Sequence, residues 1–316
     1  MRRWIKFAGL GLAVVAGTVA VRTAMFAPAG LADGTGIKVA SAPSIDSAAA
    51  AQRLGAAVRF QTVSNQDPAR NQLAEWDKLH AWLASTYPKS HAAMQREMLG
   101  KTLLYTWQGS DASAQPIIVM AHQDVVPVTP GTEKDWKHEP FAGTIAEGAV
   151  WGRGTIDDKG SLVALFEALE VLAGQGFAPR RTIYLVAGHD EEVGGTGAAA
   201  VAKVLAARKV KALFTIDEGG LITSDTPIIN GPAMMIGVAE KGYVTLEVTA
   251  PAEGGHSSAP PTEIGSVNLA RALIAIHENQ FPLELRGPGG GMLEALAAKA
   301  GGTTRMAMAN QWLFGP

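Results

Sequence analysis

Cysteine is absent from this chain of 316 residues. Its absence excludes disulfide bonds, thiolate zinc sites and cysteine nucleophiles, and it leaves the redox compartment open. Any metal ion must therefore be held by His, Asp or Glu side chains, a donor set that suits zinc in a catalytic site rich in oxygen and nitrogen.

A strong charge of either sign is also lacking. The 27 basic and 29 acidic residues give a net charge of -2, so no basic surface dominates, which argues against nucleic acid as a partner. Hydrophobic residues make up 47% of the chain, a globular composition that can bury a substantial core.

The longest apolar run near the N-terminus, residues 7–21, is too short for a comfortable transmembrane helix. Three basic residues precede it, as in a signal peptide. We therefore expect an exported protein (periplasmic, secreted or membrane-anchored), with residues 1–30 as a cleaved signal peptide or an uncleaved membrane anchor and 31–44 as a linker. The alternative is a hydrophobic tail that docks on the fold.

Helices and strands alternate over residues 45–236, and a hairpin is predicted at 94–107. Helical spacing occurs at 47–60, 72–87, 159–172 and 196–207, and strand-like runs occur at 117–121, 182–187 and 212–216, with a short strand near 150. This alternation predicts an α/β fold with a mostly parallel sheet flanked by helices.

The pattern changes over residues 237–316. Residues 242–250 alternate like a half-exposed antiparallel strand, and helices are predicted at 263–277 and around 293–299. We expect a second, smaller α+β domain that is incomplete in this chain.

Acidic clusters follow the predicted strands, and one of them contains a histidine. In open α/β sheets the strand ends converge on one crevice, where carboxylates repel each other unless a cation lies between them. The sequence therefore predicts a metal site with more than one ion. The clusters are His122-Gln123-Asp124, Asp157-Asp158, Asp190-Glu191-Glu192 and Asp217-Glu218.

His122 and Asp124 point to the same face of an extended segment, so His122 can bind metal while Asp124 orients the site. The alternative is a capping Asp beside a surface His. Helix capping explains one of Asp157 and Asp158. We favour Asp157 as a bridging carboxylate, with Asp158 or Lys159 beginning the helix.

Adjacent acids after a buried strand are costly unless their roles differ. One of Glu191 and Glu192 can bind metal while the other takes a proton from water; two solvated loop acids are the alternative. A phosphate cradle at the glycines that follow is disfavoured, because the carboxylates would repel phosphate. Glu218 is the preferred ligand of the last cluster, with Asp217 as its competitor.

His256 lies in a glycine-flanked loop of the second domain, where it would be exposed and able to contact a ligand. The remaining histidines lack such settings, and we interpret them as structural or surface residues. They are His80, His91, His138, His189 and His277.

Together these motifs resemble the di-zinc aminoacylase and carboxypeptidase family, which includes acetylornithine deacetylase and succinyl-diaminopimelate desuccinylase. The match covers about residues 45–316. The segments 240–242 and 310–314 favour the branch of Gly-X carboxypeptidases and secreted N-acyl-amino-acid hydrolases. The matching stretches are 121–128, 136–141, 152–160, 189–195, 216–220 and 255–261.

The resemblance implies two Zn²⁺ ions, with Co²⁺ or Mn²⁺ as substitutes, and Asp157 bridging them. Glu191 would be the general base, and Asp124 would orient His122. The implied zinc ligands are His122, Asp157, Glu192 and Glu218.

The second domain would be a lid that forms a homodimer, with His256 steadying the oxyanion in the partner subunit's site. The implied reaction is amide hydrolysis of small peptides or N-acyl amino acids that carry a free carboxylate. The rival hypotheses are a di-zinc aminopeptidase and a non-catalytic fragment or binding module that retains the fold.

One departure from the family concerns its last zinc ligand, a histidine near the C-terminus. This chain ends inside the lid, before that histidine, and the lid arginine that grips the substrate carboxylate is not identifiable. We therefore expect a fragment of a longer protein that supplies the histidine.

Overall fold

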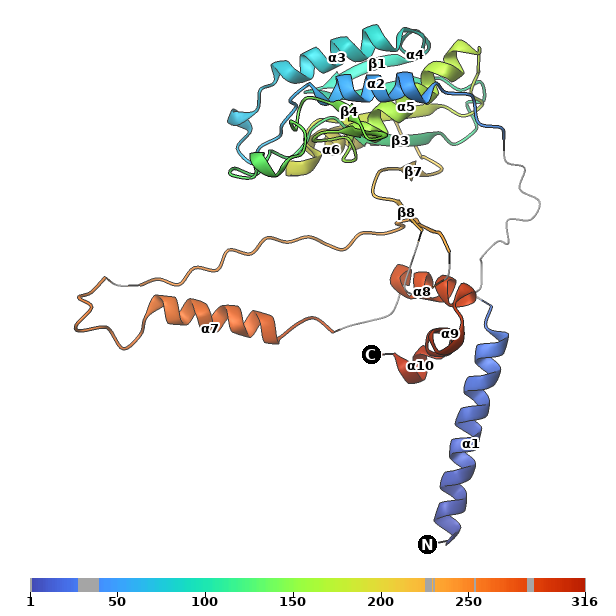
Figure 1. Ribbon diagram of the computed structural model, residues 1–316, viewed down its shortest axis with the longest axis vertical. Helices are drawn as coiled ribbons and strands as arrows, with labels where there is room; N and C mark the ends of the chain where they lie inside the picture. Colours follow the sequence, from blue (N-terminus) through green and yellow to red (C-terminus); the bar gives the residue numbers. More distant parts are fainter. Residues whose placement is uncertain are drawn as a thin grey trace. The chain divides into compact units, whose positions relative to one another are not determined.

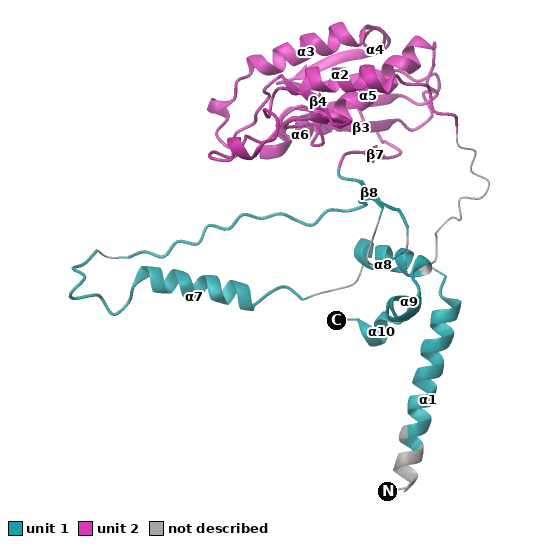
Figure 2. Ribbon diagram, viewed as in Figure 1, with its two compact units in different colours: residues 1–37, 219–316 teal, residues 38–218 magenta. Residues whose placement is uncertain are grey.

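The computed structural model describes residues 2–27, 40–224, 229, 231–252, 254–282 and 287–315. It divides into two compact units, one of residues 38–218 and one of residues 1–37 with 219–316 (Figure 2). Most of the linker predicted at 31–44 lies outside the described residues.

A five-stranded sheet forms the centre of the unit 38–218 (Figure 1). Its strand order is β1-β2-β6-β3-β7. The predicted hairpin is confirmed as β1 and β2, and β2 pairs antiparallel with β6. β3 runs parallel to both β6 and β7. The α/β class is confirmed, and the sheet is mixed because the hairpin extends its parallel part. The strands are β1 (Gln95–Leu99), β2 (Thr102–Trp107), β3 (Ile117–His122), β6 (Ile183–Gly188) and β7 (Thr215–Ile216).

Helices cover both faces of this sheet. Successive side chains on a strand point to opposite faces, so each face presents apolar side chains to a helical layer. On β6, Leu185 packs into a core with Leu79 and Phe166, whereas its neighbour Val186 packs into a core with Val201. The first core is covered by α3 (Ala74–Thr86), α4 (Pro88–Ala93) and α5 (Lys159–Gly174), and the second by α6 (Thr196–Ala207). α2 (Ser47–Val58) packs beside α5.

Short elements lie in the loops of this unit. β4 (Thr144–Ala146) and β5 (Ala149–Trp151) form a separate antiparallel pair, which confirms the strand predicted near residue 150. Three single 3₁₀ turns are η1 (Pro68–Arg70), η2 (Glu133–Asp135) and η3 (Glu191–Val193).

The second unit contains α1 (Arg2–Met25), the antiparallel pair β8 (Leu221–Thr223) and β9 (Ala233–Met235), and helices α7 (Gly265–Glu278), α8 (Gly287–Lys299), α9 (Gly302–Ala309) and α10 (Gln311–Phe314). The helices predicted at 263–277 and 293–299 are confirmed as α7 and within α8. The strand predicted at 242–250 is wrong: none of the described residues pairs with it, and an extended segment without a partner ladder is not a strand.

α1 contacts α9 within its unit. Arg305 donates hydrogen bonds to the carbonyl oxygens of Thr23 (3.0 Å) and Phe26 (2.9 Å), and the buried Asn310 donates to the hydroxyl of Thr23 (3.0 Å). Within the described parts of the chain, no helix is both long enough and apolar enough to cross a membrane. A signal peptide or membrane anchor over residues 1–30 stays a prediction.

A buried carboxylate links α5 to α2 and to Tyr87, the residue between α3 and α4. Glu167 on α5 accepts from Arg53 Nη2 on α2 (2.6 Å) and from the hydroxyl of Tyr87 (2.8 Å), and Arg53 Nε also pairs with it. Only 6% of the Glu167 side chain is exposed, so the charge depends on Arg53 for compensation.

We expect Arg53→Leu to lower the free energy of unfolding by about 2–3 kcal/mol, because it leaves the Glu167 charge buried without its partner. The double variant Arg53→Leu/Glu167→Leu should recover much of this loss, since both charges are then removed. Denaturant unfolding of the wild type, both single variants and the double variant measures the coupling. Additive effects of the two substitutions would contradict it.

Candidate metal centre

The parallel strands bring the chemical groups to one edge of the sheet. His122 is the last residue of β3 and is paired in register with Gly188, the last residue of β6. η3 follows β6 directly, and Glu218 comes two residues after β7. Because parallel strands end at the same edge, segments distant in sequence converge there.

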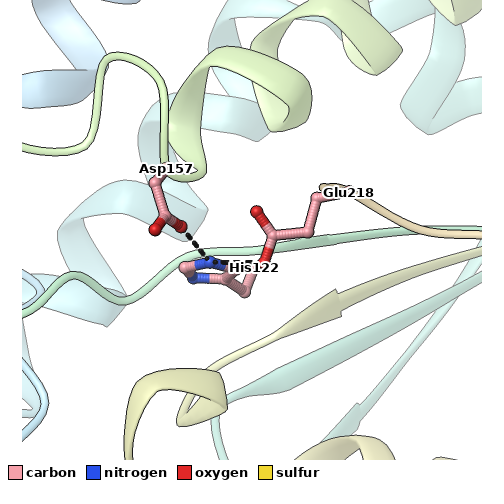
Figure 3. A group of neighbouring side chains, drawn as sticks. All are labelled: His122, Asp157 and Glu218. Atoms are coloured by element: carbon pink, nitrogen blue, oxygen red, sulfur yellow. Dashed lines mark hydrogen bonds and ion pairs between the residues drawn. The ribbon is translucent and has the colours of Figure 1, made fainter. Parts of the chain in front are cut away.

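Three side chains meet at this edge (Figure 3). His122 Nε2 lies 2.8 Å from Asp157 Oδ1 and 3.3 Å from Glu218 Oε1. One donor atom from each of the three lies within 4.8 Å of the other two, as required for a shared metal ion. The His122 side chain is 3% exposed, whereas those of Asp157 and Glu218 are 62% and 28% exposed, so the group opens on one side.

The carboxylates around His122 shift the pKa values of this group. Burial, together with the charges of Asp158 and Asp157, raises the pKa of Glu218 to about 7. Burial lowers the pKa of His122, but the hydrogen bonds and charges of Asp124, Asp157 and Glu218 outweigh it and raise that pKa to about 10. The carboxylates thus retain positive charge on the imidazole. One imidazole and two carboxylates form a donor set that fits a zinc ion, which would supply this positive charge instead.

Asp124 lies behind His122 and is fully buried. Its Oδ1 is 3.3 Å from His122 Nδ1 and accepts from the amide of Glu191 (3.1 Å), while its Oδ2 accepts from the amide of Glu192 (3.2 Å) and the hydroxyl of Ser64 (2.6 Å). The alternative of a capping Asp beside a surface His is wrong, because both side chains are buried.

Asp158 and Lys159 support the loop that carries Asp157. Asp158 is buried and accepts from the amide of His122 (3.0 Å), and it makes no side-chain cap bond to α5, so capping does not account for it. Lys159 begins α5 and is fully buried; its Nζ donates to the carbonyl oxygens of Ala57 (3.2 Å) and Phe60 at the end of α2.

The Asp190–Gly195 turn places the two glutamates. Asp190 accepts from the amides of Thr196 and Gly197 (both 2.9 Å), so these amides at the start of α6 are already bonded and form no open phosphate cradle. Burial raises the pKa of both Glu191 and Glu192 despite the nearby His122. Neither carboxylate belongs to the group of three, although their amides are held by Asp124.

Of the remaining candidate residues, only Glu218 belongs to the group of three. Asp217 accepts from the amide of Glu218 (3.0 Å), and the Glu218 carboxylate, not that of Asp217, joins the group of three. His256 is exposed, and its Nδ1 lies 2.8 Å from the hydroxyl of Ser258; both belong to the other unit.

Sequence reasoning missed two supporting residues, Ser64 and Lys159. The sequence identifies Lys159 only as a possible helix start, because a buried lysine has no local pattern. Ser64 lies in the extended segment Thr62-Val63-Ser64, where alternation places both hydroxyl residues on one side. That alternation was the available signal.

Comparison with known proteins places these residues in a family. Residues 118–304 match Peptidase family M20/M25/M40. The chain is 39% identical over 267 residues to the N-fatty-acyl-amino acid synthase/hydrolase PM20D1.1 of Danio rerio (82% of this chain, 51% of the relative). It is 40% identical over 246 residues to carboxypeptidase S of Saccharomyces cerevisiae (74% and 42%). The chain spans about half the length of the curated relatives it matches.

Solved structures show weaker likeness. The crystal structure of human carnosine dipeptidase 1 matches with a TM-score of 0.45 and 21% identity, over 56% of this chain and 41% of that one. The family match covers more than half of the chain and includes His122, Asp157 and Glu218. On these grounds, the chain belongs to peptidase family M20/M25/M40.

Proposed function

We propose that this chain carries the metal centre of a zinc-dependent hydrolase that cleaves the amide bond of small peptides or N-acyl amino acids with a free carboxylate. The observation that carries the proposal is the convergence of His122, Asp157 and Glu218 at one edge of the sheet. The names of two relatives, an N-fatty-acyl-amino acid synthase/hydrolase and a carboxypeptidase, support this substrate class.

The proposed site would hold two zinc ions, and Asp157 would be the ligand that they share. Asp157 suits that role because its side chain is the most exposed of the three. After burial, the charge of Asp157 is the largest influence that raises the pKa of Glu192, which supports a role for Glu192 at the same centre. When bound, the ions would supply Lewis acidity towards the amide carbonyl and towards an attacking water. The proposed ligands are His122, Asp157, Glu192 and Glu218.

Glu191 is the proposed general base. It takes a proton from the attacking water and passes it to the leaving nitrogen, and a base works best with a pKa near the working pH. Burial, reinforced by the charges of Asp124, Asp157 and Asp217, raises the pKa of Glu191 towards that range. Asp124 fixes the turn by holding the amide of Glu191 and at the same time orients His122.

The proposal also covers the second domain and the N-terminal segment. Residues 237–316 would form a lid that dimerises, and His256 would donate to the oxyanion in the partner subunit's site. Its exposure and its glycine-rich loop support that role. Export, with residues 1–30 as signal peptide or anchor, is also proposed.

The substrate class is tested with N-acetylated and free dipeptides of the same sequence. We expect hydrolysis of the N-acylated compounds, loss of turnover after chelation, and its return on addition of Zn²⁺. Rates are measured by release of the C-terminal amino acid. Faster cleavage of the free dipeptides would indicate an aminopeptidase, and turnover that survives complete metal removal would contradict a metal centre.

Glu191→Gln should retain zinc and lower kcat by roughly 10²–10⁴-fold, because the amide cannot accept the proton. The matched control is Glu97→Gln on the edge strand β1, where the carboxylate pairs with Arg208 at the surface. Steady-state kinetics and zinc content are measured for both. A zinc-loaded Glu191→Gln protein with normal turnover would exclude this residue as the base.

A further inference from the structure

We propose that Ser64 is a positioning residue of the metal centre: its hydroxyl fixes the Asp124 carboxylate, which in turn orients His122 and the turn that carries Glu191 and Glu192. The inference rests on the proposed function for its kinetic consequences, whereas its structural consequence is tested by metal binding alone.

Backbone hydrogen bonds fix the position of Ser64. Its amide donates to the carbonyl oxygen of Val125 (3.2 Å), and the amide of Val125 donates to the carbonyl oxygen of Thr62 (3.0 Å). Val63 forms a parallel bridge with Val125, so this segment runs alongside the chain that leaves β3. The Ser64 side chain therefore has a fixed origin next to Asp124, and the residue is only 1% exposed.

The Ser64 hydroxyl makes the shortest contact to the Asp124 carboxylate. It donates to Oδ2 at 2.6 Å, compared with 3.2 Å from the amide of Glu192 to the same oxygen. The other oxygen accepts from the amide of Glu191 (3.1 Å) and lies 3.3 Å from His122 Nδ1, which also hydrogen-bonds to the backbone carbonyl oxygen of Asp124 (2.9 Å). Each oxygen thus has two partners, and the plane of the carboxylate is set from both sides.

Removal of the hydroxyl leaves Oδ2 with one partner in a site without exposed area. A buried charged oxygen with fewer hydrogen bonds is less stable, so the carboxylate is expected to rotate towards other donors. Any rotation shifts the contact with His122, whose opposite nitrogen faces Asp157. It also shifts the contacts with the two backbone amides of η3. Ser64 therefore affects the ligand geometry and the position of the base without touching either.

The test compares zinc dissociation constants of the wild type, Ser64→Ala and Ser90→Ala, measured by competition with a chromophoric chelator. Ser90 on α4 is a matched control. It is fully buried in the same unit, and its hydroxyl donates to the carbonyl oxygen of Tyr87 (2.9 Å). We expect roughly 10-fold weaker zinc binding for Ser64→Ala, which is the smaller loss of affinity seen when residues that orient metal ligands are replaced. We expect no change for Ser90→Ala.

Two further readouts separate positioning from general stability. The midpoint of thermal unfolding without metal should fall by similar amounts in both alanine variants. On the N-acylated dipeptide, Ser64→Ala should lower kcat with little change in KM, and Ser64→Thr, which keeps the hydroxyl, should recover zinc affinity.

Equal zinc affinity in Ser64→Ala and Ser90→Ala would overturn the inference, as would a wild type that binds no zinc. A wild type that binds zinc but cleaves none of the amide substrates would overturn the proposed function alone. In that case a weaker affinity of Ser64→Ala would still support the positioning role, so the two failures are distinguishable.

Discussion

The crowding of carboxylates around His122 is the constraint on which the rest of the site depends. Asp124, Asp157 and Glu218 all contact its ring, and Asp158 binds its amide. Such a group of like charges is unfavourable in a partly buried site unless positive charge compensates it. The neighbouring carboxylates raise the pKa values of His122 and Glu218. A bound metal ion would supply the compensating positive charge.

The parallel strands of the sheet bring these carboxylates together. β3, β6 and β7 are parallel, so their ends deliver His122, the η3 turn and Glu218 to one place. The packed cores on both faces fix the strands, and Ser64 and Lys159 then fix the loops that leave them. The reactive side chains are therefore held by groups that are themselves buried.

Much of this arrangement follows from sequence pattern. The hairpin at 94–107 and the alternation of helices and strands were predictable, because period-2 and period-3.6 spacing are local. The convergence of the acidic clusters followed from the topology of α/β sheets. The unpaired segment 242–250 was mispredicted as a strand, because alternation describes one strand and says nothing about a partner to pair with. Ser64 acts across 60 positions of sequence, a contact that no local pattern encodes.

His122, Asp157 and Glu218 form part of the proposed metal centre. Elemental analysis of the purified chain, beside a His122→Ala variant purified in the same way, tests it most directly. We predict bound zinc in the wild-type chain and a marked loss in the variant. A wild-type chain without bound metal after exposure to excess Zn²⁺, or equal metal content in both proteins, would contradict a metal centre at His122.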